Sequence, residues 1–91
     1  MEVELGARLR EQYDTLDERI QSRLKDRLKL FKKDPENPVL RNHELKEKWQ
    51  GYRSIDITGD YRAIFKEVGQ EEGKFAFFVA LGNHKELYQQ N

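Results

Sequence analysis

The sequence contains no cysteine, which excludes disulfide bonds and thiolate metal sites and fits a reducing compartment. It also lacks long apolar runs: none approaches the ~18–20 residues that span a membrane, and the N-terminus MEVELGARLR has no apolar signal-peptide core. Only two prolines are present, and both lie in the stretch 34–47, which we expect to form a loop. We therefore expect one cytoplasmic domain over residues 1–91.

The chain also lacks a net charge: its 17 basic and 17 acidic side chains give a formal net charge of zero. Zero net charge argues against indiscriminate nucleic-acid binding, since affinity for phosphate comes mainly from clustered lysine and arginine. The charge is nevertheless uneven: residues 1–18 sum to −4, residues 19–53 to +6 and residues 54–91 to −2. The basic middle segment is either the solvated face of a helix or a local patch for a phosphate backbone.

The first third of the chain carries a helical pattern. Residues 1–5 alternate in polarity and predict a short strand, and residues 7–13 favour a helix. Thr15 and Glu18 have the spacing of a capping box, and Asp34-Pro35 ends the helix that they open. The sequence therefore predicts a helical hairpin or one bent helix. Its apolar stripe recurs every three or four residues and consists of Leu16, Ile20, Leu24, Leu28 and Phe31.

The next segment predicts a β-hairpin. Residues 48–58 alternate in polarity and place Trp49, Ile55 and Ile57 in one phase. The dipeptide Gly59-Asp60 is typical of a turn, because glycine accepts positive φ and aspartate tolerates turn positions. Residues 61–68 then form the returning strand.

The last third predicts another strand and a short helical turn. The segment KFAFFVAL, residues 74–81, is the most apolar strand, which favours a central position in the sheet. Residues 84–88 have the spacing of one final helical turn. The predicted fold class is α+β: two N-terminal helices, or a helical hairpin, packed on a twisted antiparallel sheet of three to four strands, with a short C-terminal helical turn.

Several kinds of catalytic site are excluded by the residues present. Zinc is a poor interpretation, because the two histidines lie 41 residues apart and no cysteine joins them. Neither serine has the glycines of a nucleophile elbow, and the glycines sit singly rather than in a phosphate-binding loop. We therefore expect no metal and no cofactor.

The remaining polar residues combine carboxylate, guanidinium, imidazole and phenol groups, which suits metal-free cleavage of RNA. In that chemistry a base takes the 2′-OH proton, an arginine stabilises the phosphorane and an acid protonates the leaving 5′-oxygen. His84 directly follows the apolar strand, and a histidine there can transfer protons near neutral pH. Tyr61 or Tyr88 could stack on a splayed base. The set consists of Arg53, Asp56, Asp60, Arg62, His84 and Tyr88.

The order of these pieces resembles the RelE/ParE toxin superfamily, most closely its RelE/StbE and YafQ-like branch. The resemblance covers nearly the whole chain and rests on four landmarks in order: NHEL, GYRSIDI, GDYRAIF and LGNHKELY. It implies a small α+β fold and the activity of a type II toxin, namely a ribosome-dependent mRNA endoribonuclease (mRNA interferase). It also implies a cognate antitoxin, the ribosomal A site and mRNA as partners.

The resemblance implies a role for each matching residue. His43 matches the loop histidine of YafQ-like members, and Asp60 matches the acidic position that YoeB-like and YafQ-like members use in catalysis. Arg62 matches the strand arginine that contacts the scissile phosphate in RelE-like members. His84 resembles the C-terminal histidine that acts as general acid or base, and Tyr88 the aromatic residue that orients the substrate base.

Two positions depart from the YafQ-like pattern. This chain has Asp56 where YafQ-like members have a histidine, and Ala80 where they have an arginine. The general base stays open among Asp56, Asp60 and His43. The alternatives to an active nuclease are a ParE-like gyrase inhibitor and a catalytically weakened relative that acts as a protein-binding module. The residues expected to bind substrate, including two lysines of the basic segment, are Arg53, Asp56, Tyr61, Lys46 and Lys48.

Overall fold

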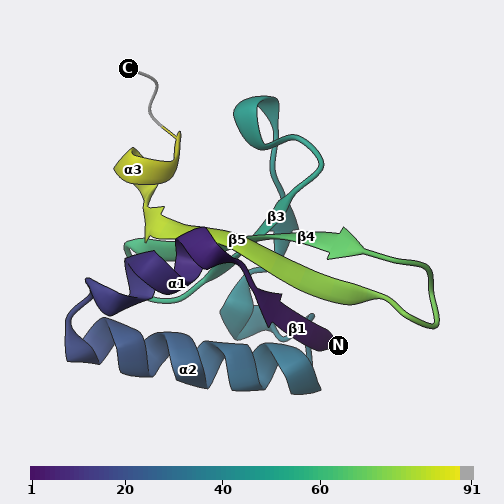
Figure 1. Ribbon diagram of the computed structural model, residues 1–91, viewed down its shortest axis with the longest axis horizontal. Coiled ribbons are helices and arrows are strands. Elements are labelled where there is room, and N and C mark those ends of the chain that lie inside the picture. The colour runs from purple at the N-terminus through teal and green to yellow at the C-terminus, as the bar shows by residue number, and fades with distance from the viewer. Residues whose placement is uncertain (89–91) are drawn as a thin grey trace.

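A computed structural model describes residues 1–88 as helices packed on a five-stranded sheet (Figure 1). None of the helices in this part of the chain is long and apolar enough to cross a membrane. The strands are β1 (Glu2–Leu5), β2 (His43–Glu44), β3 (Arg53–Asp56), β4 (Tyr61–Val68) and β5 (Phe75–Asn83). The α-helices are α1 (Ala7–Asp14), α2 (Glu18–Lys33) and α3 (His84–Tyr88), and the 3₁₀ helices are η1 (Pro38–Leu40) and η2 (Glu47–Trp49).

The sheet has the strand order β1-β5-β4-β3-β2. The predicted α+β class is confirmed, but the sheet has more strands than expected and is mixed, because β1 pairs with β5 in parallel. The additional strand is β2, which lies in the segment expected to be a loop and pairs with β3 over only two residues. β5 is an interior strand bounded by β1 and β4, as its apolar sequence predicts, although β4 is the middle one.

The two N-terminal helices form the predicted hairpin, but α2 begins differently from the expectation. Asp17 is the N-cap residue, and its carboxylate accepts hydrogen bonds from the N–H groups of Arg19 and Ile20. Thr15 instead donates its hydroxyl to the carbonyl oxygen of Gln12, at the end of α1. The predicted capping box of Thr15 and Glu18 is therefore wrong, because the chain needs Thr15 to close the first helix.

Replacing Asp17 with alanine should lower the free energy of unfolding by about 1 kcal/mol, because two backbone N–H groups lose their acceptor. Urea denaturation of both proteins measures this difference. Asp26→Ala is the matched control, since it removes the same charge from an exposed position inside α2. Equal losses in the two variants would contradict the cap assignment.

The main core lies between the sheet and the helices α1 and α2 (Figure 1). Three phenylalanines from different elements meet there: the ring centroid of Phe31 lies 5.0 Å from that of Phe65 and 5.4 Å from that of Phe78. All three side chains are fully buried. Ile55 and Ile57 both join this core, so the prediction that these two residues lie in one phase is confirmed.

A second, smaller cluster covers the opposite face of the sheet, on the side where α3 lies (Figure 1). Its buried members are Ile64, Ala80 and Leu87. Trp49 packs against this cluster and lies in η2 rather than in a strand, so its predicted place in phase with Ile55 is wrong. Both faces of the sheet are therefore covered at this end, and the second face carries the polar residues described next.

Candidate active site

Asp56, Arg62 and Gly82 form one row across β3, β4 and β5. Paired residues on neighbouring strands point to the same face, and this row continues the face that carries Ile64. The guanidinium Nε of Arg62 lies 3.4 Å from the Asp56 carboxylate, in an ion pair whose side chains are only 21% and 18% exposed. The predicted phosphate-binding arginine is therefore already paired with a carboxylate.

The turn between β3 and β4 places Asp60 and Tyr61 beside this row. The hydroxyl oxygen of Thr58 accepts hydrogen bonds from the N–H groups of Asp60 (3.2 Å) and Tyr61 (3.0 Å). The N–H of Ile57 donates to the carbonyl oxygen of Tyr61 at 2.8 Å and closes the turn. Asp60 is left exposed at the tip, with its carboxylate available to a ligand.

A reciprocal cap fixes the start of α3. The N–H of Asn83 donates to the Glu86 carboxylate at 2.9 Å, and the N–H of Glu86 donates to the Asn83 side-chain oxygen at 2.8 Å. This is the arrangement of a capping box. Gly82 permits it, because a Cβ there would lie 3.1 Å from the Glu86 carboxylate and 3.3 Å from its Cβ. The first turn of the helix can therefore fold back over the end of β5.

This helix carries the two aromatic candidates on one side. The ring centroids of His84 and Tyr88 lie 4.7 Å apart at an interplanar angle of 52°. The indole N–H of Trp49 donates to the carbonyl oxygen of Leu87 at 2.8 Å, which ties η2 to the helix. Carbonyl groups near a helix end lack an intrahelical partner, so this bond satisfies one of them.

Trp49→Phe should lower the free energy of unfolding by about 1 kcal/mol and loosen α3, because the Leu87 carbonyl loses its donor. Chemical denaturation gives the energy, and nuclear Overhauser contacts between the His84 and Tyr88 rings report on the helix. Tyr52→Phe serves as control, since it keeps the ring that packs edge-on against Trp49. Unchanged ring contacts in the Trp49 variant would contradict this role.

A cavity of about 350 Å³ lies between the β3–β4 turn and the start of α3. Four of the predicted site residues line it, while Asp56 adjoins it through Arg62 and Tyr88 through His84. A carboxylate, a guanidinium and an imidazole thus border one solvent-accessible space, which is the set that acid–base cleavage of a phosphodiester requires. The lining residues are Gly59, Asp60, Tyr61, Arg62, Asn83, His84 and Lys85.

The other predicted residues lie elsewhere. His43 does not line this cavity; it is exposed on β2, with its ring Nδ1 2.7 Å from the carbonyl oxygen of Arg41. It pairs with Ser54, so it lies on the same sheet face as Asp56, one pair further along. Lys48 lies in η2, with its ammonium group 5.9 Å from the centroid of the Trp49 ring.

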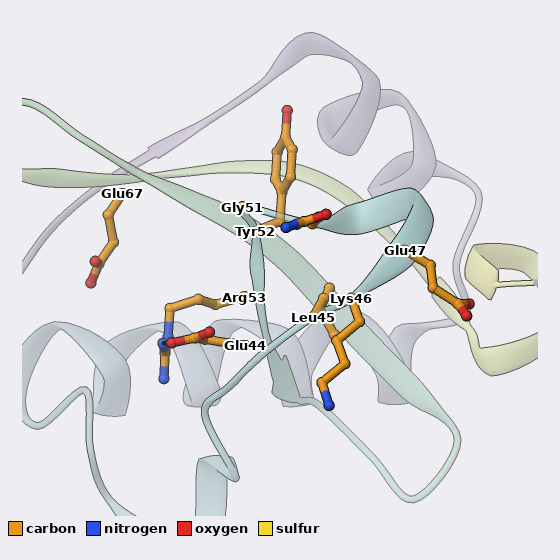
Figure 2. Close-up of a pocket in the computed structure, with 9 residues that line it drawn as sticks. Glu44, Leu45, Lys46, Glu47, Gly51, Tyr52, Arg53 and Glu67 are labelled. Atoms are coloured by element: carbon orange, nitrogen blue, oxygen red, sulfur yellow. Dashed lines mark ion pairs between the residues drawn. The ribbon is translucent and has the colours of Figure 1, made fainter.

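Arg53 and Lys46 line a larger cavity of about 780 Å³ (Figure 2). The Nε of Arg53 donates to the side-chain oxygen of Asn42 at 2.8 Å, and its guanidinium pairs with Glu44 at 3.7 Å. Figure 2 shows Lys46 and Tyr52 pointing in different directions, and the guanidinium of Arg53 is already bound by Asn42 and Glu44. The smaller cavity, although less voluminous, is therefore the better candidate for catalysis.

Three features of the site were not predicted from the sequence. Lys85 lines the cavity only because it follows His84 on a capped helix. The spacing of Asn83 and Glu86 is a capping-box signal that could have predicted the start of α3. Arg41, in a loop, pairs with Asp56, in β3, at 3.7 Å. A local sequence pattern cannot predict such a contact, because the two residues are far apart in the chain.

No protein-family model matches the chain, and no curated protein matches it either. Solved structures do match: YafQ from E. coli strain BL21(DE3) has a TM-score of 0.76 at 21% identity, covering 97% of this chain and 98% of that one. A YoeB/ParE toxin from Agrobacterium tumefaciens has a TM-score of 0.74 at 21% identity, covering 92% and 99%. The chain has the fold of these toxins.

A third structure with this toxin fold is the YoeB dimer from Staphylococcus aureus, with a TM-score of 0.69 at 16% identity over 92% of this chain and 97% of that one. The matches extend over nearly the full length of each chain, so the shared fold accounts for most of this domain. The fold implied by the four sequence landmarks is thus confirmed.

Proposed function

We propose that this chain is the toxin of a type II toxin–antitoxin system and acts as a ribosome-dependent mRNA endoribonuclease. The observation that carries the proposal is the cavity in which Asp60, Arg62 and His84 meet, on a chain with the fold of such toxins. Base, phosphate-binding cation and acid are the three roles that cleavage next to a 2′-hydroxyl needs.

In the proposed reaction, Asp60 takes the proton of the 2′-hydroxyl, and the 2′-oxygen attacks the adjacent phosphorus. Arg62 stabilises the charge that develops on the phosphorane. The bond from phosphorus to the 5′-oxygen then breaks, and His84 supplies the proton to that oxygen. The products are a 2′,3′-cyclic phosphate and a free 5′-hydroxyl. The ring of Tyr88, beside His84, orients the substrate base by stacking.

His43 and Asp56 remain alternative bases in this proposal. His43 lies outside the cavity, so it would act only on a substrate that extends along the sheet face towards β2. Asp56 is closer, but its carboxylate is held by Arg62, and a base in that position would have to leave its partner to reach a hydroxyl. Exposed Asp60 needs no such rearrangement and is therefore the first choice.

The proposed partners follow from charge and from the solved structures. The E. coli DinJ–YafQ toxin–antitoxin complex contains a chain of this fold, with a TM-score of 0.69 at 22% identity. We therefore propose a cognate antitoxin for this chain. The basic segment 19–53 and the residues Arg53, Lys46 and Lys48 would contact ribosomal RNA in the cytoplasm, so raised salt should weaken association with ribosomes.

One observation favours a second candidate, a catalytically weakened relative that binds a partner protein. Arg62 is paired with Asp56, and Ala80 is fully buried, so β5 offers no second phosphate-binding side chain at that position. A protein of this kind would keep the fold and the antitoxin but cut no message. The Asp56–Arg62 ion pair is the feature that distinguishes the two candidate functions.

Expression in growing bacteria separates these functions and the ParE-like alternative of gyrase inhibition. The nuclease proposal predicts growth arrest with new mRNA ends and no DNA-damage response. Growth arrest with a DNA-damage response and intact mRNA would favour gyrase inhibition instead. Normal growth with intact mRNA at high expression would favour the protein-binding relative.

A further inference from the structure

Two arginines from different elements converge on a single carboxylate at the edge of the candidate site. The Nε of Arg62 lies 3.4 Å from one oxygen of Asp56, and the Nε of Arg41 lies 3.7 Å from the other. Arg62 comes from β4, whereas Arg41 follows η1, more than twenty residues earlier in the chain. The two guanidinium groups therefore flank one anion, with a local net charge of +1.

The backbone at Arg41 supports this arrangement. Arg41 has φ 50° and ψ 46°, in the left-handed region, which costs an L-residue about 1–2 kcal/mol. Neighbouring contacts hold it there: its N–H donates to the carbonyl oxygen of Pro38 at 3.2 Å, and buried Leu40 anchors the preceding residue. Strained conformations that the surrounding structure maintains are concentrated at functional sites.

The loop around Arg41 is also tied to the sheet. The side chain of Asn42 donates to the carbonyl oxygen of Pro35 at 3.0 Å and accepts from the Nε of Arg53 at 2.8 Å. The pairing of His43 with Ser54 then fixes the loop against β3. Arg41 is consequently a long side chain on a fixed base, and 73% of this side chain is exposed to solvent.

We propose that Arg41 is a second phosphate-binding residue of the candidate site, and that the Asp56 carboxylate occupies the position of the phosphate between the two arginines in the resting protein. This inference rests on the proposed function for the identity of the substrate as RNA. A phosphodiester carries the same single negative charge as the carboxylate and offers two oxygens to two guanidinium groups. Substrate phosphate would displace Asp56 and take its two partners.

A purely structural role for Arg41 makes a different prediction, which the Asp56→Asn variant reveals. If Arg41 only pairs with Asp56, then Arg41→Ala has no further effect once the carboxylate has been neutralised. If Arg41 binds phosphate, its loss weakens RNA binding in both backgrounds. Neutralising Asp56 alone also removes the competing anion, so Asp56→Asn should bind RNA more tightly than the unaltered protein.

The experiment measures fluorescence anisotropy of a short single-stranded RNA oligonucleotide with five proteins across a series of salt concentrations. They are the unaltered chain, Arg41→Ala, Asp56→Asn, the double variant and the control Arg8→Ala, which removes an exposed arginine on α1, outside the basic segment 19–53. We expect Arg41→Ala to raise Kd about three- to tenfold in both backgrounds. The slope of log K against log salt should fall in magnitude by about 0.7 for the lost contact. Arg8→Ala should change neither quantity.

Three results would overturn the inference: no RNA binding by the unaltered chain at low salt, equal behaviour of Arg41→Ala and Arg8→Ala, or an Arg41 effect that disappears in the Asp56→Asn background. Cleavage of translated mRNA by the unaltered chain is measured separately. Arg41-dependent binding without cleavage would contradict the proposed function and support this inference. Cleavage without any effect of Arg41→Ala on RNA binding would support the proposed function and contradict this inference.

Discussion

Replacing His84 with alanine is expected to lower the rate of mRNA cleavage by about 10²–10⁴-fold, because the leaving 5′-oxygen loses its proton donor. His84 is exposed at the start of α3, and the cap of that helix is made by Asn83 and Glu86. The substitution should therefore change the free energy of unfolding by no more than about 0.5 kcal/mol. Quantitative primer extension on a translated message measures the rate, and urea denaturation measures the stability.

The control for His84 is Gln70→Ala, an exposed position in the segment between β4 and β5, outside the residues that line the cavity. It should cleave at the rate of the unaltered chain. A His84 variant that folds and cleaves at the full rate would contradict the role of His84 as the acid. His84→Gln would show whether a hydrogen-bonding side chain without a transferable proton restores any activity.

Arg62→Ala is expected to lower cleavage by about 10²–10³-fold, because the developing charge on the phosphorane loses its nearest fixed cation. It should also lower the free energy of unfolding by about 1–2 kcal/mol, since the Asp56 carboxylate, only 18% exposed, then keeps only the looser contact with Arg41. The two effects have different origins, so they can be separated by a second substitution.

The double variant Arg62→Ala with Asp56→Ala separates stability from catalysis. Removing both partners should recover most of the lost stability, because no unpaired carboxylate remains. It should not recover cleavage, because the Arg62 guanidinium is still missing from the phosphate. Recovery of cleavage along with stability would show that Arg62 acts only through the fold. Arg8→Ala, at an exposed position on α1, controls for the loss of an arginine as such.

The sequence predicted those parts of the fold that depend on local periodicity. The stripe of α2 that includes Leu24, Leu28 and Phe31 and the apolar run of β5 each mark a buried face over several turns or residue pairs, so their type is evident without tertiary contacts. β2 could not be predicted in this way, because two residues carry no period and form a strand only by pairing with β3. The cap at Asp17 depends on where α1 ends, which sequence spacing alone does not determine.

The candidate site was predictable as a set of residue types but not as an arrangement. Asp60, Arg62 and His84 were all expected from the chemistry, and the structure places them around one cavity. The pairing of Asp56 with Arg62 depends on the register across the β3–β4 turn, where Thr58 holds the N–H groups of the two residues after Gly59. Contacts of this kind depend on the exact length and conformation of the turn.

The most direct test of the central claim is primer extension on a defined mRNA after incubation with the purified protein in a reconstituted translation reaction. The same message without ribosomes serves as the parallel sample. We predict new ends that carry a 2′,3′-cyclic phosphate, that occur only in the translated message, and that are lost in His84→Ala and Arg62→Ala. An intact message at high protein concentration, with ribosomes actively translating it, would contradict the account.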